Sequence, residues 1–288
     1  MKHNINNITV IGAGAMGSQI AMVAALAGFS TTVVDIEQVS LDRAKEQLWS
    51  RVDRDVEKGR RTAEAVQQAK ELLQFSTDQD AAVANTDFVI EAAVENLAIK
   101  RDIFAQLDKT APAQAILTTN SSNIMSSQIA DATNRPDKVC NMHFFNPALV
   151  MQGVEVVPHE GTSQETRDIT IAVTDAFGKD VIELKQEIPG FVANRLLGAL
   201  RLEALKLYDA GVADFQDIDR AAKGALRHPM GPFELMDLVG IDVAYLVRMA
   251  EYEQTGDEAS KPHPVLAAKY ATGDYGRKTG KGWYDYSE

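Results

Sequence analysis

The sequence has a single cysteine and a shortage of positive charge. Cys140 is the only cysteine in 288 residues, so no intrachain disulfide can form, which fits a reducing compartment. Because Cys140 lies in an apolar run, we interpret it as a buried, inert thiol. Lys and Arg number 29 against 41 Asp and Glu, a formal net charge of −12. Nucleic acids and anionic membranes are bound through broad cationic surfaces, so this balance argues against both as partners.

Long apolar runs and metal-ligand clusters are also missing. No apolar stretch approaches the roughly 20 residues that a transmembrane helix needs. The first residues, MKHNINNITVIGAGAMG, have no signal-peptide hydrophobic region, and we expect a cytoplasmic protein. The His, Cys and Asp residues show no metal-ligand spacing, so no metal site is predicted.

The beginning of the chain has the pattern of a dinucleotide-binding unit. A β-branched run at 8–11 precedes the turn GAGAMG at 12–17, and a helical apolar stretch follows it. A second β run at 31–34 ends at Asp35. A bare glycine motif is a weak signal, but strand, turn, helix, strand and acid in this order are a strong one.

Each part of this segment has a physical reason. Gly12 makes the tight turn, Gly14 lets the backbone approach a pyrophosphate, and Gly17 lets the helix pack closely on the sheet. The helix N-terminus supplies N–H groups for the phosphates. Asp35 can accept both ribose hydroxyls and would repel a 2′-phosphate, which favours NAD over NADP. The predicted cofactor contacts here are Gly12, Gly14, Ala15, Met16, Gly17 and Asp35.

Alternation of short β runs with helical segments continues along the first half. The β runs lie at 87–93, 115–120, 138–145, 154–157 and 180–184. Alternating β and α segments predict an α/β fold of the Rossmann type with a mainly parallel sheet. Ligands bind beyond the carboxyl ends of such strands, so the polar residues of EAAVEN (91–96) and TTNSSN (118–123) are site candidates.

The second half carries no β signal. Helical patterns cover roughly 191–210, 214–227, 231–238, 240–255 and 264–271. We therefore predict two domains, a dinucleotide-binding domain at 1–188 and an all-helical domain at 189–288.

A row of cations lies on one face of the helix predicted after Asp35. Arg51, Arg54, Lys58 and Arg61 are spaced i, i+3, i+7 and i+10. One interpretation is an ordinary solvated face. The other is an anion-binding face that suits the phosphates of a second nucleotide-like ligand, such as coenzyme A.

His143 lies among aromatic and aliphatic residues, with Glu155 twelve positions later. A histidine in such a run is usually a core residue, but its ordinary pKa near 6.5 also suits a general base. A carboxylate on the second ring nitrogen would fix its tautomer. Ser122 is either a helix N-cap or a ligand of a substrate oxygen, and Asn194 is either a helix-surface amide or a donor to a substrate carbonyl.

Seven stretches together resemble the short-chain 3-hydroxyacyl-CoA dehydrogenase family, especially the bacterial 3-hydroxybutyryl-CoA dehydrogenases. They are GAGAMG, VIEAAVEN followed by IKRDIF, HFFNP, VEVV, PGFVANR, HPMGP and GRKTGKGWYDY. The resemblance covers essentially the whole chain, in order and with family-like spacing.

The resemblance implies specific roles for matching residues. It places the catalytic pair on His143 and Glu155, the active-site serine on Ser122 and a substrate-binding asparagine on Asn194. It also places a cofactor contact on Asp35, and it adds Glu95, Lys100, Asn120, Ser122 and Asn146.

It also implies the partners and the assembly. NAD is the expected cofactor and an acyl-CoA the expected substrate, with Arg54 and Lys58 as contacts of coenzyme A. The family fold is a dinucleotide-binding domain followed by a helical dimerisation domain, with the active site in the cleft between them. We therefore expect a homodimer through the helical domain.

The expected reaction is reversible NAD-dependent oxidation of an (S)-3-hydroxyacyl-CoA, most simply 3-hydroxybutyryl-CoA. Two departures adjoin the expected pocket: NSSN stands for the usual NTSS, and MQGVEV for MKLVEV, which changes the residues at 121, 123, 152 and 153. A related thioester, dicarboxylic or bound to acyl carrier protein, is therefore an alternative substrate. A non-catalytic NAD-binding structural protein is a further alternative.

Overall fold

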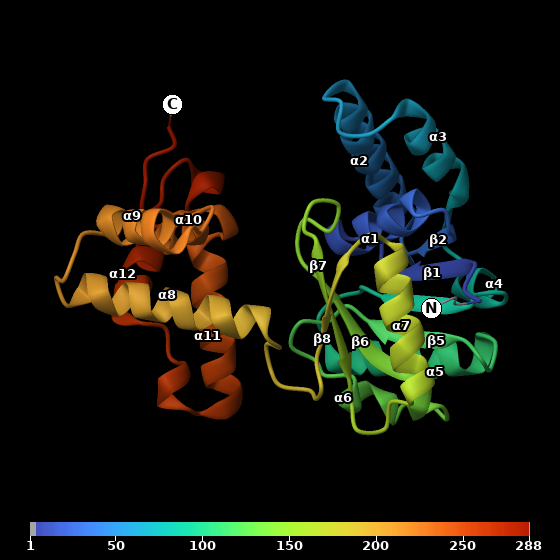
Figure 1. Ribbon diagram of the computed structural model, residues 1–288. Helices are drawn as coiled ribbons and strands as arrows, with labels where there is room; N and C mark the ends of the chain where they lie inside the picture. The colour runs from blue at the N-terminus through green and yellow to red at the C-terminus, as the bar shows by residue number, and fades with distance from the viewer. Residues whose placement is uncertain (1–3, 288) are drawn as a thin grey trace. The chain divides into compact units, whose positions relative to one another are not determined.

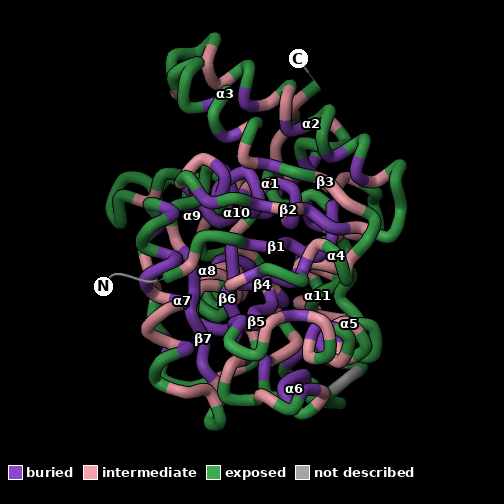
Figure 2. Tube along the Cα trace, turned by 90° about the vertical axis from the view of Figure 1, so that its right-hand side faces the viewer, coloured by how far each residue is buried: buried purple, intermediate pink, exposed green. Residues whose placement is uncertain are grey.

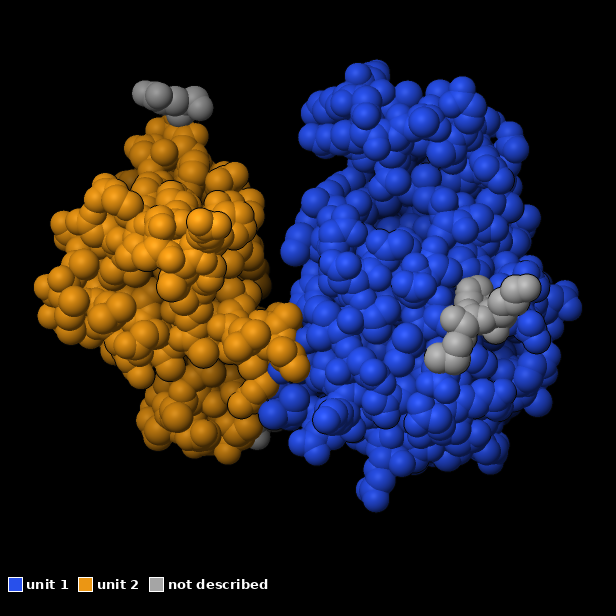
Figure 3. All heavy atoms as spheres, viewed as in Figure 1, with its two compact units in different colours: residues 1–191 blue, residues 192–288 orange. Residues whose placement is uncertain are grey.

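The computed structural model describes residues 4–287 and divides into two compact units (Figures 1 and 3). The first unit ends at Phe191 and the second begins at Val192, whereas the sequence places the boundary between residues 188 and 189. The first unit is an α/β domain and the second is helical, which confirms the predicted fold class.

One sheet organises the first unit. Within the described residues it has eight strands in the order β3-β2-β1-β4-β5-β6-β7-β8. All neighbours run parallel except the antiparallel pair β6 and β7. The strands are β1 (Asn7–Ile11), β2 (Ser30–Val34), β3 (Leu73–Ser76), β4 (Phe88–Glu91), β5 (Ile116–Thr119), β6 (Val139–Phe144), β7 (Gly153–Pro158) and β8 (Asp180–Glu183). The sheet reverses its order of connection beside β1, and such a switch point is where doubly wound sheets bind ligands.

The central strands are buried along their whole length because helices cover both faces of the sheet. Every residue of β4 and of β5 is buried, and Figure 2 shows the buried trace running through the strands. Side chains on the two faces belong to two separate core clusters. Parallel sheets covered on both faces favour mostly apolar strands, and the polar residues of β4 and β5 stand only at their carboxyl ends.

The strand β3 (Leu73–Ser76) was not predicted. Its four residues, LQFS, follow α3 (Ala63–Leu72) without a break, so the apolar pattern of the helix runs into the strand. As the edge strand of the sheet, β3 pairs only with β2. A short edge strand buries little of its surface, which leaves a weak alternating pattern.

The helices of the first unit pack against the sheet through apolar stripes and begin at polar caps. In α2 the buried residues are Leu41, Ala44, Leu48 and Val52, one face of a 3.6-residue period. Side-chain oxygens of Thr62, Asn96 and Ser163 cap α3, α5 and α7. The helices are α1 (Ala15–Leu26), α2 (Gln38–Glu57), α3, α4 (Gln79–Val83), α5 (Leu97–Thr110), α6 (Ser127–Ala130), α7 (Gln164–Ala176) and the 3₁₀ turn η1 (Pro136–Lys138).

The second unit is a helical cluster around an aromatic core. Phe233 is fully buried and contacts the rings of Tyr208, Phe215 and Trp283. Its elements are α8 (Ala193–Asp209), α9 (Phe215–Leu226), α10 (Pro232–Val239), α11 (Ile241–Thr255), η2 (Glu258–Ser260), α12 (Pro264–Ala271) and η3 (Arg277–Thr279). No helix within residues 4–287 is both long and apolar enough to cross a membrane.

A buried carboxylate fastens the C-terminal segment to the second unit. Asp237 of α10 accepts hydrogen bonds from the backbone N–H groups of Trp283 and Tyr284, both at 2.9 Å, and from the Tyr286 hydroxyl at 3.1 Å. A Cβ added at Gly282 would lie 2.1 Å from the Asp237 carboxylate oxygen. The closing motif GRKTGKGWYDY is thus a structural element that packs around one aspartate.

Candidate active site

The loops that follow β1, β4 and β5 meet at one edge of the sheet, because these strands are parallel neighbours. Backbone hydrogen bonds join them in pairs: Ala92 N–H donates to Ile11 O and Asn120 N–H to Glu91 O, both at 2.7 Å. The glycine turn, EAAVEN and TTNSSN therefore lie side by side at the carboxyl ends of the strands.

The glycine turn has the shape of a dinucleotide cradle. Gly12 has φ +102°, and a Cβ there would lie 2.7 Å from Ala92 O. A Cβ at Gly17 would lie 2.0 Å from Gly12 O, whereas nothing lies within 4 Å of one at Gly14. Gly12 and Gly17 thus serve close packing, and Gly14 leaves an open approach at the start of α1.

The first turn of α1 is open to an anion. Gly14 caps the helix without a side chain, and Ala15 and Met16 begin it with no acidic residue in the first turn. Amide N–H groups at a helix start, together with the positive end of its dipole, attract phosphate. These residues fit the pyrophosphate of a dinucleotide.

Asp35 stands beside this turn at the end of β2. Its Oδ2 accepts the Ala13 N–H at 2.8 Å, and its Oδ1 accepts the Glu37 N–H at 3.1 Å. The carboxylate is therefore held in place by the turn itself and still has lone pairs for ribose hydroxyls. The position matches that of the acid which binds the adenosine ribose in Rossmann-type folds.

His143 and Glu155 face each other across the antiparallel pair β6 and β7. They are direct partners in the register, and His143 Nδ1 lies 2.8 Å from Glu155 Oε2. Both side chains are buried, at 3% and 0% exposed. An ionised carboxylate only accepts hydrogen bonds, so Nδ1 carries the proton and Nε2 presents its lone pair.

Ser122 completes this array from the loop after β5. Its Oγ lies 3.0 Å from His143 Nε2, so the hydroxyl donates to the free ring nitrogen. The buried Asn141 of β6 fixes the loop, since its Nδ2 donates to the carbonyl oxygens of Ser121 and Ile124, both at 3.2 Å. Serine, histidine and carboxylate thus form one hydrogen-bonded array, contributed by the loop after β5, by β6 and by β7. Such an array can activate a nucleophile or serve as a general base.

The predicted cofactor residue Lys100 is buried in an ion pair that the sequence analysis missed. Its Nζ lies 2.7 and 2.9 Å from the two carboxylate oxygens of Glu91, and the two side chains are 1% and 0% exposed. Glu91 also accepts the Ala93 N–H at 2.7 Å and the Thr119 hydroxyl at 2.6 Å. The sequence did offer a signal for this ion pair: Glu91 ends the otherwise apolar strand FVIE, nine residues before Lys100.

Glu95 connects this pair to the serine loop. Its Oε2 is 3.5 Å from Lys100 Nζ, and its Oε1 accepts the Ser121 hydroxyl and, at 3.2 Å, the Asn123 N–H. The Ser121 hydroxyl and the backbone N–H of Asn123, on either side of Ser122, thus hold the loop in place through Glu95.

The other predicted cofactor residues border β6. Asn120 Oδ1 accepts the Phe144 N–H at 2.9 Å, which ties the end of β5 to the end of β6. Asn146 is exposed in the loop after β6. Lys179 holds that loop, because its buried Nζ donates to Ala148 O and Met151 O at 2.7 Å each.

The remaining predicted residues belong to α2, with its C-cap, and to α8 of the second unit. Arg54 and Lys58 are exposed at the C-terminal end of α2. Asn194 is exposed in the first turn of α8, in the second unit. Gly153 stands where the family usually has leucine. A Cβ there would lie 3.0 Å from Ile182 Cδ1, so Ile182 of β8 packs against the space that the leucine side chain would take. Among the described residues, no three His, Cys, Asp or Glu side chains are grouped to hold a metal.

Comparison with known proteins finds one family along both units. Residues 7–188 match the family model of the 3-hydroxyacyl-CoA dehydrogenase NAD binding domain, and residues 190–286 match that of the C-terminal domain. A probable 3-hydroxybutyryl-CoA dehydrogenase of Bacillus subtilis is 38% identical over 284 residues, which are 99% of this chain and 98% of the relative. Human mitochondrial hydroxyacyl-coenzyme A dehydrogenase is 37% identical over 288 residues, 98% of this chain and 91% of the relative.

A solved structure agrees along the whole chain. That of (S)-3-hydroxybutyryl-CoA dehydrogenase from Ralstonia eutropha has a TM-score of 0.90 at 34% identity, covering 99% of this chain and 100% of that one. The glycine turn with Asp35 at the sheet edge, the helical second unit and the matches to both domain models together show that this chain belongs to the 3-hydroxyacyl-CoA dehydrogenase family of NAD-dependent oxidoreductases.

Proposed function

We propose that the chain reversibly oxidises (S)-3-hydroxyacyl-CoA thioesters with NAD, with 3-hydroxybutyryl-CoA as the simplest substrate. The hydrogen-bonded array of Ser122, His143 and Glu155 carries the proposal, because alcohol oxidation needs a base for the hydroxyl proton. This base lies in the unit that holds the predicted NAD turn. A non-catalytic NAD-binding protein has no need of such an array.

The mechanism follows from the two nitrogens of His143. When substrate binds, the Ser122 hydroxyl turns its hydrogen bond from Nε2 to the substrate 3-hydroxyl oxygen, and Nε2 takes the proton of that hydroxyl. Glu155, on Nδ1, stabilises the imidazolium that forms. Held by the turn 12–17 and Asp35, NAD would supply the acceptor for the hydride of carbon 3. In the reverse direction, protonated His143 gives its proton to the 3-keto oxygen.

The other predicted residues bind and orient. We assign the pyrophosphate to the turn 12–17, the adenosine ribose to Asp35, and the nicotinamide half of NAD to Glu95, Asn120 and Asn146. The buried Lys100 supports this half through its ion pair with Glu95. Asn194 is proposed to donate to a substrate carbonyl. The buried, disulfide-free Cys140 supports a cytoplasmic location.

Initial rates on a thioester panel test the proposed function. We expect oxidation of (S)-3-hydroxybutyryl-CoA with NAD, and a kcat/KM with NADP lower by about two orders of magnitude, since Asp35 would repel a 2′-phosphate. The panel includes a dicarboxylic 3-hydroxyacyl-CoA, an acyl carrier protein thioester and the truncated N-acetylcysteamine thioester. Turnover of none of them despite NADH binding would refute the proposal, whereas preference for another thioester would change only the substrate.

The truncated thioester also tests the role of Arg54 and Lys58. We propose that these exposed cations at the end of α2 bind the phosphates of coenzyme A. Arg54→Ala combined with Lys58→Ala should then raise the KM of the CoA thioester about tenfold, and leave unchanged the KM of the truncated thioester and of NAD. Lys109→Ala, which removes a cation from the last turn of α5, is the matched control. Equal effects on both thioesters would favour the solvated-face interpretation.

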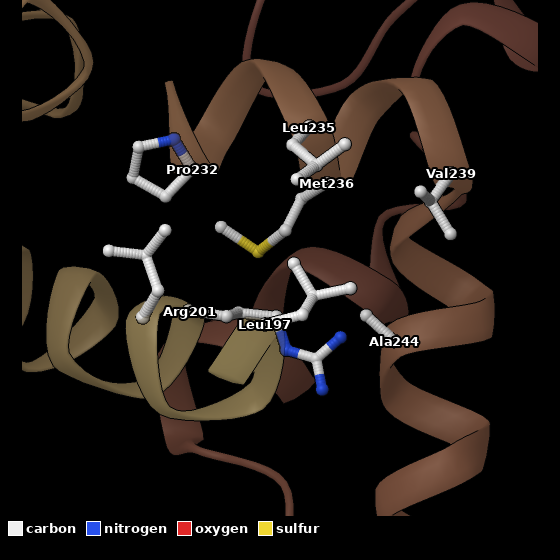
Figure 4. A pocket seen from close by; sticks show the side chains of 8 residues that line it. Leu197, Arg201, Pro232, Leu235, Met236, Val239 and Ala244 are labelled. Atoms are coloured by element: carbon white, nitrogen blue, oxygen red, sulfur yellow. The ribbon is translucent and has the colours of Figure 1, made fainter. Parts of the chain in front are cut away.

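We also propose a homodimer through the second unit. A small apolar hollow lies between α8, α10 and α11 (Figure 4). Its lining residues are Leu197, Leu200, Arg201, Pro232, Leu235, Met236, Val239 and Ala244. Exposed apolar side chains continue along α10 and α11, namely Leu238, Val239, Val243, Leu246 and Val247. Exposed apolar side chains gathered on two packed helices mark a protein interface, and C2 self-association is the commonest way to cover them.

Sedimentation velocity tests the dimer. Leu246 is 51% exposed on this face. The variant Leu246→Lys places a charge there and should convert the dimer to a monomer. The control is Leu226→Lys at the end of α9, where the leucine is 62% exposed, and this variant should stay dimeric. A wild-type chain that sediments as a monomer at micromolar concentration would contradict the proposal.

A further inference from the structure

Phe191, the last residue of the first unit, has an unusual backbone and a buried ring. Its φ is +48°, in the left-handed region that a bulky side chain rarely adopts. Its N–H donates to Ile188 O at 3.0 Å and closes a turn. The ring is 1% exposed and packs in a cluster with Val157 and Leu184. A strained backbone persists only where surrounding contacts hold it, so we conclude that packing holds the ring of Phe191 in place.

The Phe191 ring lies beside the imidazole of His143. The centroids of the two rings are 5.4 Å apart at 59°, and Phe145 approaches the imidazole at 4.7 Å and 65°. The imidazole nitrogens meet Glu155 and Ser122. A half-turn of the imidazole would put carbon atoms where the nitrogens stand and break both hydrogen bonds. Two aromatic rings this close to a buried imidazole leave little room for that turn.

The segment that leads to Phe191 is itself anchored. Glu187 Oε1 accepts the Ser126 hydroxyl at 2.7 Å and the Ser127 N–H at 2.9 Å. The Ser126 N–H donates to Asn141 Oδ1 of β6 at 2.7 Å. The segment before Phe191 is therefore connected, through Ser126, to the strand that carries His143.

We infer that Phe191 is a positioning residue: its ring, carried by the anchored linker, holds the His143 imidazole in the orientation that joins Glu155 to Ser122. The inference rests on the proposed function for the role of His143 as the base. Its geometric part, the orientation of the imidazole, does not depend on which substrate is turned over. An ordinary core residue would contribute to stability alone.

Phe191→Leu separates positioning from packing, because leucine fills most of the space but lacks the planar ring beside the imidazole. We expect kcat to fall about tenfold or more, since small misplacements of a base slow proton transfer strongly. The KM for NAD and the Kd of NADH should stay within about twofold, because the glycine turn is untouched. Phe191→Met, whose unbranched and flexible side chain adapts better to an irregular space, repeats the test if the leucine variant does not fold.

Phe177→Leu is the matched control. Phe177 is also a buried aromatic of the first unit, but it contacts Phe29 and Phe144. This variant should lose stability to a similar extent and keep its kcat. If Phe191→Leu behaves like Phe177→Leu, with a lower Tm and an unchanged kcat, Phe191 is a packing residue and the inference is wrong.

A second comparison uses the left-handed backbone. Alanine is strained at φ +48° and glycine is not, so Phe191→Gly should melt at or above the Tm of Phe191→Ala. This reverses the usual order for the two residues. Both should lose kcat to a similar extent, because both lack the ring. A glycine variant with wild-type kcat would show that the backbone alone positions the site.

Proton exchange at His143 Nδ1, followed by NMR without substrate, separates this inference from the proposed function. The hydrogen bond to buried Glu155 protects that proton, and a loosened imidazole exposes it. Exchange at least about tenfold faster in Phe191→Leu than in Phe177→Leu supports the inference even if no thioester is turned over. Equal exchange rates in the two variants would overturn it even if the enzyme is active.

Discussion

Replacing His143 with asparagine should lower kcat by about two to four orders of magnitude, the usual contribution of a general base, and leave the Kd of NADH nearly unchanged. Asparagine keeps a polar side chain in the pocket but has no nitrogen that can accept a proton. The glycine turn and Asp35 lie on other strands, so the cofactor should bind as before. Stopped-flow hydride transfer and fluorescence titration with NADH measure the two quantities separately.

Two further variants sharpen this test. His159, whose Nε2 contacts Pro136 O at 3.0 Å at the end of β7, is a histidine outside the array, and His159→Asn should retain kcat. Glu155→Gln should lose activity nearly as severely as His143→Asn, because an amide N–H facing Nδ1 would favour the tautomer whose Nε2 cannot accept a proton. An active His143→Asn enzyme would mean that the proton leaves by another group.

Replacing Lys100 with methionine should lower the unfolding free energy of the first unit by about 3–5 kcal/mol, the usual effect of breaking a buried ion pair. The Glu91 carboxylate, 0% exposed, would keep its hydrogen bonds from Ala93 and Thr119 but lose its countercharge. A buried charge without a partner is costly. Urea unfolding, followed by the fluorescence of Trp49 in the first unit, measures the loss.

Removing the orphaned charge should restore much of the stability. The double variant Lys100→Met with Glu91→Gln should be more stable than Lys100→Met alone, because a neutral amide is cheaper to bury than a carboxylate. Arg60→Met is the surface control: Arg60 Nη1 lies 3.3 Å from Asp55 Oδ1 and the arginine side chain is 65% exposed, and such a pair contributes less than about 1 kcal/mol. Comparable losses for Arg60 and Lys100 would contradict the importance of burial.

The local parts of the candidate site were predictable because their requirements are local. Gly12 needs a positive φ and close contact with Ala92, and Gly17 needs close contact with Gly12, so only glycine satisfies the turn. Asp35 follows directly from the end of β2. Helical and β periodicities likewise separated the α/β half from the helical half. The exception was β3, whose four residues carry too short a pattern at the sheet edge.

The resemblance supplied candidate residues in the sequence but not their contacts. His143 and Glu155 are twelve positions apart, and only the antiparallel register of β6 and β7 makes them direct partners. Ser122 meets His143 across 21 residues because β5 and β6 are neighbours. In a strand, a shift of one residue turns every side chain to the opposite face, so the register decides whether this array exists.

The dinucleotide turn, the order of the α/β and helical parts and, through family motifs, the candidate site residues could be predicted from the sequence. Three contacts appear only in the folded chain: Lys100 is buried against Glu91, Glu95 fastens the serine loop, and Phe191 lies beside His143. Glycine conformation, helix caps and periodic burial are properties of short segments, and a sequence pattern reports them. Buried ion pairs and ring contacts join residues from separate strands and linkers, and they exist only once the sheet has brought those segments together.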